Sequence, residues 1–173
     1  SCLIFIRHPL QRFLSCYTER FQYRSGLPLQ QLSISSLHNI LVNWTDSLHG
    51  CNNEIARWIS PSSGWGDRYI NEGSLSDAEK AETKRRMDQC VIVDLTYNQT
   101  ASKSVLNYFF PWILDYDVEN SKGNGHHSNH IEVDSLPLSH QNLIMSYNKV
   151  DLELYEHGLA NLNKQVDYIR DKQ

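Results

Sequence analysis

The sequence predicts an α/β fold in which at least two parallel strands alternate with helices. Three observations support this prediction. An apolar run at residues 2–6 is followed at once by an amphipathic helical pattern. A second apolar run, at residues 90–95, follows a long charged helical region, and another helical pattern begins soon after it. Strands and helices that alternate in this way are typical of α/β domains with a parallel sheet.

Length and composition are typical of one globular domain, which we expect to span residues 1–173. The chain has 173 residues, 40% hydrophobic residues and a net charge of -4. This composition excludes collagen, coiled coils and disorder. A negative chain without a Lys/Arg run disfavours a nucleic-acid partner, so any anionic ligand must be bound locally. No apolar stretch is long enough for a membrane helix, and we expect no membrane contact within these residues.

The first half of the chain predicts a strand, two helices and a long loop. Residues 2–6 are continuously apolar and predict a strand buried on both faces. Pro9 suits the first turn of a helix that continues to about residue 23, and a second helical stripe covers residues 34–48. Residues 60–74 are rich in Pro, Ser and Gly and predict a loop. Trp65 in this loop either pins the loop to the core or stacks on a sugar or adenine.

The second half predicts a helix, a buried strand and three further helices. Ser76 and Glu79 form a capping box that opens a helix to about Gln89, and residues 90–95 predict the second buried strand. A helix follows from about residue 100 to residue 110. Residues 119–134 are polar and predict a loop. Residues 139–147 predict a helix, and an apolar stripe that runs from Tyr155 to residue 169 predicts a terminal helix.

The four cysteines share no CxxC spacing, which argues against a zinc ribbon or a thioredoxin-type site. Cys2, Cys16 and Cys90 lie in apolar segments. We therefore expect buried thiols, with one structural disulfide as the alternative.

Two polar residues near the first strand predict an anion site. Arg7 follows the strand directly, and Ser15 lies off the apolar stripe of the next helix. Arg offers a fork of donors matched to phosphate, and open α/β sheets bind ligands at the carboxyl ends of their strands. The alternative is an exposed Arg and a solvated Ser without a ligand.

Residues 7–17 read RHPLQRFLSCY and contain the pattern R-x-P-x-x-R-x-x-S-x-Y. This segment resembles the 3'-phosphate-binding segment of sulfotransferases that use 3'-phosphoadenosine 5'-phosphosulfate (PAPS). Residues 91–106 resemble the later strand and helix of that family. Residues 151–157, DLELYEH, resemble the D-x-x-L-Y stretch of Golgi-type carbohydrate sulfotransferases. The resemblance is strong at residues 3–21 and weaker elsewhere.

The resemblance implies a P-loop-NTPase-like parallel sheet flanked by helices, and PAPS as the cofactor. Arg7 and Ser15 would bind the 3'-phosphate of the nucleotide, and Lys122, before Gly123, would belong to a loop that closes over it. Arg12 and Tyr17 would have packing or helix-orienting roles. The reaction would be transfer of a sulfuryl group to a hydroxyl of a carbohydrate acceptor, and no metal would be required.

The family's 5'-phosphosulfate loop and its His or Glu base normally precede this segment, so we expect the general base upstream of Ser1. Residues 1–173 would then be a C-terminal portion of a sulfotransferase domain, and we assign no catalytic residue within it. The alternative function is a non-catalytic module that binds nucleotide or glycan. The resemblance favours the Golgi lumen, with a type II membrane anchor upstream, for a eukaryotic protein and the cytoplasm for a bacterial one.

Two further candidates remain. His126, His127 and His130 could bind a metal, but their spacing matches no zinc pattern and a polar loop is the favoured interpretation. Asp94 ends the second strand, where it could contact the acceptor or cap the following helix.

Overall fold

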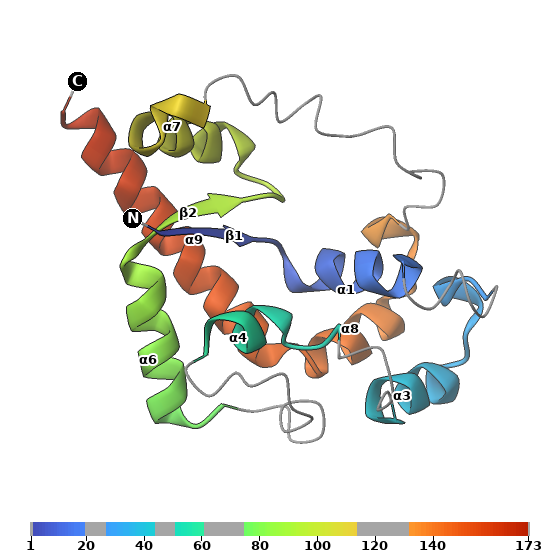
Figure 1. The fold of residues 1–173 in the computed structure, drawn as a ribbon. Helices are drawn as coiled ribbons and strands as arrows, with labels where there is room; N and C mark the ends of the chain where they lie inside the picture. Colours follow the sequence, from blue (N-terminus) through green and yellow to red (C-terminus); the bar gives the residue numbers. More distant parts are fainter. Residues whose placement is uncertain (1, 20–26, 44–50, 61–74, 114–131, 173) are drawn as a thin grey trace.

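The computed structural model describes residues 2–19, 27–43, 51–60, 75–113 and 132–172 (Figure 1). Its centre is a parallel sheet formed by β1 (Cys2–Ile6) and β2 (Cys90–Asp94), with Cys2 opposite Cys90 and Ile6 opposite Asp94. The described elements are mostly helices. The prediction of a mixed α/β fold with parallel strands separated by helices is confirmed.

Three helices surround β2. These are α6 (Asp77–Asp88), α7 (Gln99–Phe109) and α9 (Lys149–Arg170), the long helix that crosses the sheet in Figure 1. β2 is buried from its second residue onward, as the sequence predicted. Its main-chain edge is also covered, because the Gln165 side chain of α9 accepts a hydrogen bond from the Ile92 N–H (3.1 Å) and donates one to the Cys90 carbonyl (2.8 Å). This amide takes the place that a neighbouring strand would occupy.

The prediction that β1 is buried on both faces is wrong. Ile6 is fully buried, and a Cβ added to Gly158 of α9 would lie 2.8 Å from Ile6 Cδ1. Phe5 is 52% exposed. Successive side chains of a strand point to opposite faces, so α9 covers the face that carries Ile6 and not the face that carries Phe5.

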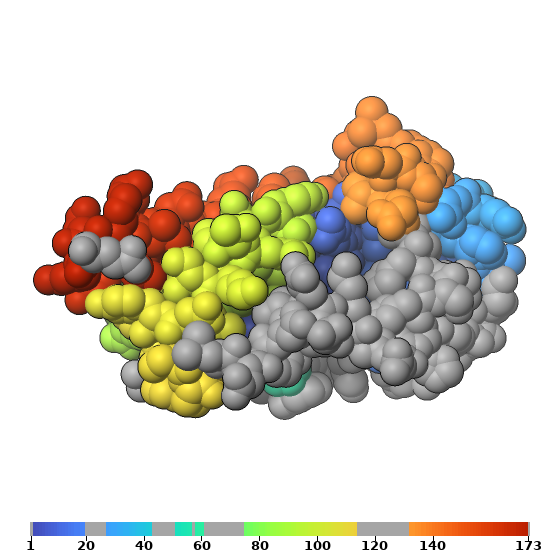
Figure 2. Space-filling view, turned by 90° about the horizontal axis from the view of Figure 1, so that it is seen from above, coloured from blue at the N-terminus to red at the C-terminus, as the bar shows by residue number. Residues whose placement is uncertain are grey.

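A second apolar cluster lies beyond the carboxyl end of β1. It joins α1 (Pro9–Tyr17), the short helix η2 (Leu29–Gln31), α3 (Ile34–Asn43), η4 (Val133–Ser135) and α8 (Leu138–Ser146). In Figure 1, α1 continues away from the sheet toward α8 and α3. In the view of Figure 2, the C-terminal end of α9 and residues 27–43 lie at opposite ends of the molecule. The junction between β1 and α1 therefore connects the two clusters.

The remaining described elements are α4 (Glu54–Ile59) and η3 (Pro111–Ile113). The sequence did not predict α4. It did predict the capping box of α6, which is confirmed: the Glu79 N–H donates to Ser76 Oγ (3.3 Å), and the Ser76 N–H donates to Glu79 Oε2 (2.9 Å). The helices predicted near residues 100–110, 139–147 and 155–169 correspond to α7, α8 and α9.

The prediction of buried thiols is wrong, because all four cysteines form disulfides. Cys2 pairs with Cys90 across the sheet, with a Cα–Cα distance of 4.7 Å, and Cys16 of α1 pairs with Cys51, at 5.7 Å. The first pair follows from the parallel register, which places these two residues directly opposite each other. The second pair joins α1 to the segment that leads into α4.

Candidate functional site at the carboxyl ends of the strands

The carboxyl ends of β1 and β2 meet at one edge of the sheet because the strands are parallel. The Leu95 N–H donates to the Ile6 carbonyl (2.9 Å), and the His8 N–H donates to Thr96 Oγ1 (2.8 Å). These bonds hold the first residues after β1 beside the turn that follows β2. This edge is where open α/β sheets bind ligands.

Asp94 fixes the turn after β2. Its buried carboxylate, 1% exposed, accepts hydrogen bonds from the backbone N–H groups of Thr96 (2.9 Å), Tyr97 (3.1 Å) and Asn98 (2.9 Å). Asn98 is the N-cap residue of α7. Asp94 thus holds the turn that leads to the N-cap of α7, and its donors precede the first turn of the helix; contact with an acceptor stays a prediction.

Tyr155 of α9 also contacts Asp94. Its hydroxyl donates to the carboxylate at 3.3 Å from Oδ1. Burial and the charge of Asp94 raise the pKa of Tyr155 to about 12. The D-x-x-L-Y stretch therefore has a structural explanation: Tyr155 bonds Asp94, Leu154 is in the core, and Asp151 accepts the N–H groups of Ile55 (2.9 Å) and Ala56 (2.8 Å) at the start of α4.

His8 fills the space between the two tyrosines at this edge. The centroid of its ring lies 5.5 Å from the ring of Tyr155 and 6.0 Å from that of Tyr97, both in edge-to-face geometry. Its Nδ1 is buried and has no hydrogen-bond partner in the described part of the chain. Burial lowers the pKa of His8, although the nearby charge of Asp94 acts in the opposite direction. His8 is therefore neutral at neutral pH.

Arg7 is partly buried at the end of β1. Within the described ranges, its guanidinium has no hydrogen bond or ion pair. Burial lowers the pKa of Arg7 below its ordinary value, and the charge of Arg12 lowers it further. An Arg side chain nevertheless stays protonated. The result is a partly desolvated cation that no described carboxylate compensates.

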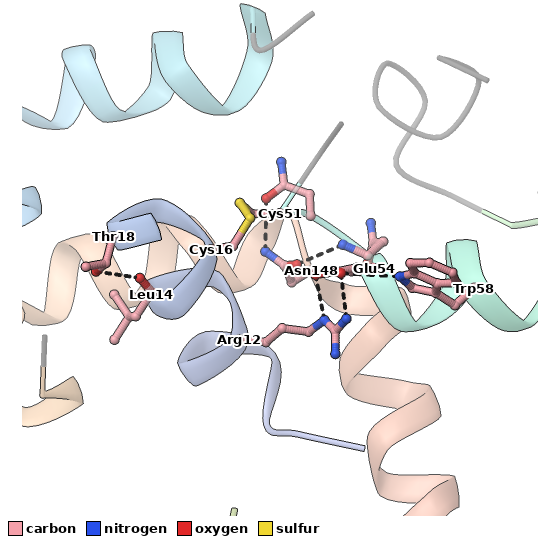
Figure 3. The surroundings of a disulfide bond; sticks show 10 residues. Arg12, Leu14, Cys16, Thr18, Cys51, Glu54, Trp58 and Asn148 are labelled. Atoms are coloured by element: carbon pink, nitrogen blue, oxygen red, sulfur yellow. Dashed lines mark hydrogen bonds and ion pairs between the residues drawn. A yellow bond between two sulfur atoms is a disulfide. The ribbon is translucent and has the colours of Figure 1, made fainter. Parts of the chain in front are cut away.

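Arg12, in contrast, is paired. Its Nε and Nη2 atoms each lie 2.7 Å from a carboxylate oxygen of Glu54, as Figure 3 shows. The other pattern residue assigned to packing, Tyr17, is fully buried and donates from its hydroxyl to the Leu27 carbonyl (3.0 Å). Both contacts agree with the packing and helix-orienting roles predicted for these two residues.

Ser15 lies three residues after Arg12 on α1, so the two side chains share one side of the helix. Ser15 is partly buried, and its hydroxyl makes no hydrogen bond within the described segments. The rise from Pro9 to Ser15 is about 9 Å. An extended Arg7 side chain together with a phosphate group can bridge such a distance. Arg7 at the β1–α1 junction and Ser15 nearly two turns into α1 are thus two donor groups that no described residue engages.

Sequence reasoning missed the segment that precedes α4. Cys51 and the two asparagines after it are buried. The Asn53 N–H donates to Asn148 Oδ1 (2.9 Å), and its Nδ2 donates to the Tyr147 carbonyl (2.9 Å). Asn53 adopts φ 48°, a left-handed conformation that Asn tolerates. An Asn before Glu and an apolar pair is a helix-start signal that could have identified α4.

Several positions named in the sequence-based predictions lie outside the described residues. The general base predicted upstream of Ser1 lies outside residues 1–173 and stays a prediction. The predicted positions outside the described residues are Trp65, Lys122 and the histidines His126, His127 and His130. Among the residues that the structure describes, no group of three or more His, Cys, Asp or Glu side chains is arranged to hold a metal ion. Within the same ranges, no helix has the length and apolar character needed to cross a membrane.

The fold and the site define a mixed α/β protein with a small parallel sheet and, among its described residues, an uncompensated arginine at the carboxyl end of the first strand. Comparison with family models, with curated proteins and with solved structures found no match. The function is therefore proposed from the residues and their geometry.

Proposed function

We propose that this chain is the nucleotide-binding portion of a PAPS-dependent sulfotransferase that acts on a carbohydrate hydroxyl, with a P-loop-like sheet. Arg7 and Ser15 bind the 3'-phosphate of the nucleotide, and Lys122, which lies outside the described residues, is proposed from the family resemblance alone as a further ligand of that phosphate. The proposal depends most on one observation: Arg7 is partly buried and has no described partner of opposite charge.

Arg7 is a partly desolvated guanidinium without a partner in the part of the chain that the structure describes. Removing a charge from water costs free energy unless a partner of opposite charge compensates it. Five residues further on, Arg12 has such a partner in Glu54. The contrast supports a ligand that carries negative charge to Arg7, since a guanidinium fork matches the oxygens of a phosphate group.

The start of α1 adds donors to the same place. Its N-cap residue, His8, makes no side-chain capping bond, and Pro9 follows at the first helical position. The N–H groups of the first turn and the helix dipole favour an anion there. Together with the R-x-P-x-x-R-x-x-S-x-Y pattern, Arg7 and Ser15 favour a phosphate monoester over a carboxylate ligand, because the terminal oxygens of a phosphate can accept from the guanidinium fork and from the hydroxyl at the same time.

The residues of this edge have separate tasks in the proposed reaction. PAPS, when bound, supplies the sulfuryl group and a phosphate leaving group. Arg7 and Ser15 bind the 3'-phosphate and thereby fix the orientation of the donor, which lowers the entropic part of the barrier. Asp94 and Tyr155 hold the turn after β2 rigid beside them. We assign no general base to the described residues, and a base upstream of Ser1 stays a prediction.

Ligand-induced stabilisation tests this function. Adenosine 3',5'-bisphosphate should raise the melting temperature of the protein at concentrations at which adenosine 5'-monophosphate has little effect. Equal effects of the two nucleotides would contradict the proposal. An assay with labelled PAPS and the full-length protein then distinguishes an enzyme from the alternative, a module that binds nucleotide or glycan: label appears on a carbohydrate only for the enzyme.

A further inference from the structure

We infer that Glu54 is a positioning residue of the anion site: its ion pair with Arg12 withholds Arg12 from anions and leaves Arg7 as the cation that selects the ligand. This inference rests on the proposed function, because it explains how the site distinguishes a 3'-phosphate from other anions. Glu54 lies on α4, outside every motif that pointed to the site.

The first observation is that Arg7 and Arg12 lie in the same region and that, of the two, only Arg12 has an ion pair among the described residues, with Glu54. Arg12 is close enough for its charge to lower the pKa of Arg7. A single anion could therefore be attracted by both guanidinium groups. The bidentate ion pair with Glu54 occupies the Nε and Nη2 donors of Arg12, each 2.7 Å from a carboxylate oxygen. Arg7 has no such contact within the described residues.

The second observation is that water screens this pair only weakly. The side chains of Arg12 and Glu54 are 23% and 22% exposed. Partly buried pairs with two parallel hydrogen bonds are stronger and better oriented than exposed pairs. An anion that approaches from solvent must therefore displace a well-placed carboxylate to reach Arg12, whereas Arg7 is available to it directly.

The third observation is that Glu54 itself is held in place. The backbone N–H groups of Ile55 and Ala56, directly after it, donate to Asp151 of α9, and the Nε1 of Trp58 donates to Glu54 Oε1 (3.3 Å). Figure 3 shows the Glu54 carboxylate between the Trp58 ring and the Arg12 guanidinium, with the Cys16–Cys51 disulfide nearby. The carboxylate is thus positioned from α9 through α4, independently of any ligand.

The consequence concerns both charge and geometry. With the pair intact, the two arginines and Glu54 together present one net positive charge, that of Arg7. Without Glu54 they present two, and an anion can bind at Arg12 as well. Glu54 therefore lowers the general affinity for anions while it raises the preference for a ligand that fits Arg7 and Ser15 together. Specificity of this kind arises from suppressing the wrong complex as well as from binding the right one.

The test uses two neutral variants with opposite expected effects. Calorimetry at low salt measures the affinity for inorganic phosphate and for adenosine 3',5'-bisphosphate. Glu54→Gln frees Arg12, so affinity for inorganic phosphate should rise about three- to tenfold, and the preference for the bisphosphate over inorganic phosphate should fall by a similar factor. Arg12→Gln removes the cation that balances the Glu54 carboxylate, so affinity for inorganic phosphate should fall by about the same factor.

Two further variants complete the design. The double variant Arg12→Gln/Glu54→Gln restores charge balance, so its phosphate affinity should lie within about twofold of wild type. Glu153→Gln is the matched control, because it also removes a carboxylate paired with cations, Lys80 and Lys84, but on the α6–α9 side of the fold. Its phosphate affinity should be unchanged.

If Glu54 had only a structural role, Glu54→Gln would lower the stability of the protein and would weaken the binding of inorganic phosphate and of the bisphosphate together. The inference is overturned if Glu54→Gln binds inorganic phosphate no more tightly than wild type, or if both single variants weaken it equally. If Glu54→Gln does not fold, the double variant Arg12→Gln/Glu54→Gln provides the test. If the double variant loses the preference for the bisphosphate over inorganic phosphate, Arg12 itself binds the ligand and the inference is overturned. A wild-type protein that does not prefer the bisphosphate contradicts the proposed function, while the comparison with inorganic phosphate still tests Glu54.

Discussion

Replacing Asp94 by Asn tests whether this carboxylate holds the site together or contacts a ligand. The carboxylate accepts three backbone N–H groups at 2.9–3.1 Å and the Tyr155 hydroxyl at 3.3 Å. An amide has one acceptor oxygen, and its NH2 group would face backbone donors, so about two of these bonds are lost. Hydrogen bonds to a buried charged group contribute roughly 1.5–3 kcal/mol each. We expect Asp94→Asn to lower the free energy of unfolding by about 3–6 kcal/mol.

Urea unfolding followed by circular dichroism measures this change, and the slope of the transition should stay constant. Tyr155→Phe is the companion variant, because it removes a single long hydrogen bond and keeps the ring; we expect a loss of about 0.5–1.5 kcal/mol. The reasoning is refuted if Asp94→Asn stays within about 1 kcal/mol of wild type. A stable variant that loses sulfuryl transfer would instead restore the acceptor-contact role.

Three other predictions concern the disulfides, His8 and α6. The denatured, unreduced protein should contain no titratable thiol, and the reduced protein should contain four. Free thiols before reduction would contradict the pairing. Replacing both Cys16 and Cys51 by Ser should lower the free energy of unfolding by about 2–4 kcal/mol. Burial lowers the pKa of His8, so its contribution to stability is present above the ordinary pKa of about 6.5 and is lost as the pH falls through the lowered value. His8→Gln should flatten the acid side of the stability profile, and an NMR titration that places the pKa of His8 above about 6.5 would reverse this. Ser76→Ala should lower the free energy of unfolding, measured with urea, by about 1 kcal/mol, because it removes the capping box of α6. A change below about 0.3 kcal/mol would mean that the capping box contributes little to stability.

The fold elements with strong local signals were predictable from the sequence. The apolar run of β2, the capping box of α6 and the terminal apolar stripe each depend on a few neighbouring residues. The partial exposure of β1 was not predictable in this way. A continuous apolar run gives no information about which face receives a helix, and Phe5 and Ile6 differ in burial only because α9 packs on one side.

Long-range pairings account for what the sequence could not show. The partner of Cys2 depends on the strand register, and the partner of Cys16 depends on where α4 packs. Glu54 has an ordinary sequence context, yet it forms the ion pair with Arg12. Arg7 and Ser15 were identifiable because their residue types, spacing and place at a strand end formed a recognisable pattern. The absence of a carboxylate partner for Arg7 among the described residues became visible only in the structure.

The central claim is that Arg7 and Ser15 bind a 3'-phosphate, and calorimetric titration with two nucleotides tests it most directly. Wild type should bind adenosine 3',5'-bisphosphate far more tightly than adenosine 5'-monophosphate. Arg7→Ala and Ser15→Ala should each weaken the bisphosphate by about ten- to a hundredfold, more for Arg7→Ala because it removes both charge and a fork of donors. The double variant should lose the preference while its affinity for the monophosphate hardly changes. Equal affinity of the wild type for both nucleotides, or a folded Arg7→Ala variant that still prefers the bisphosphate, would contradict the claim.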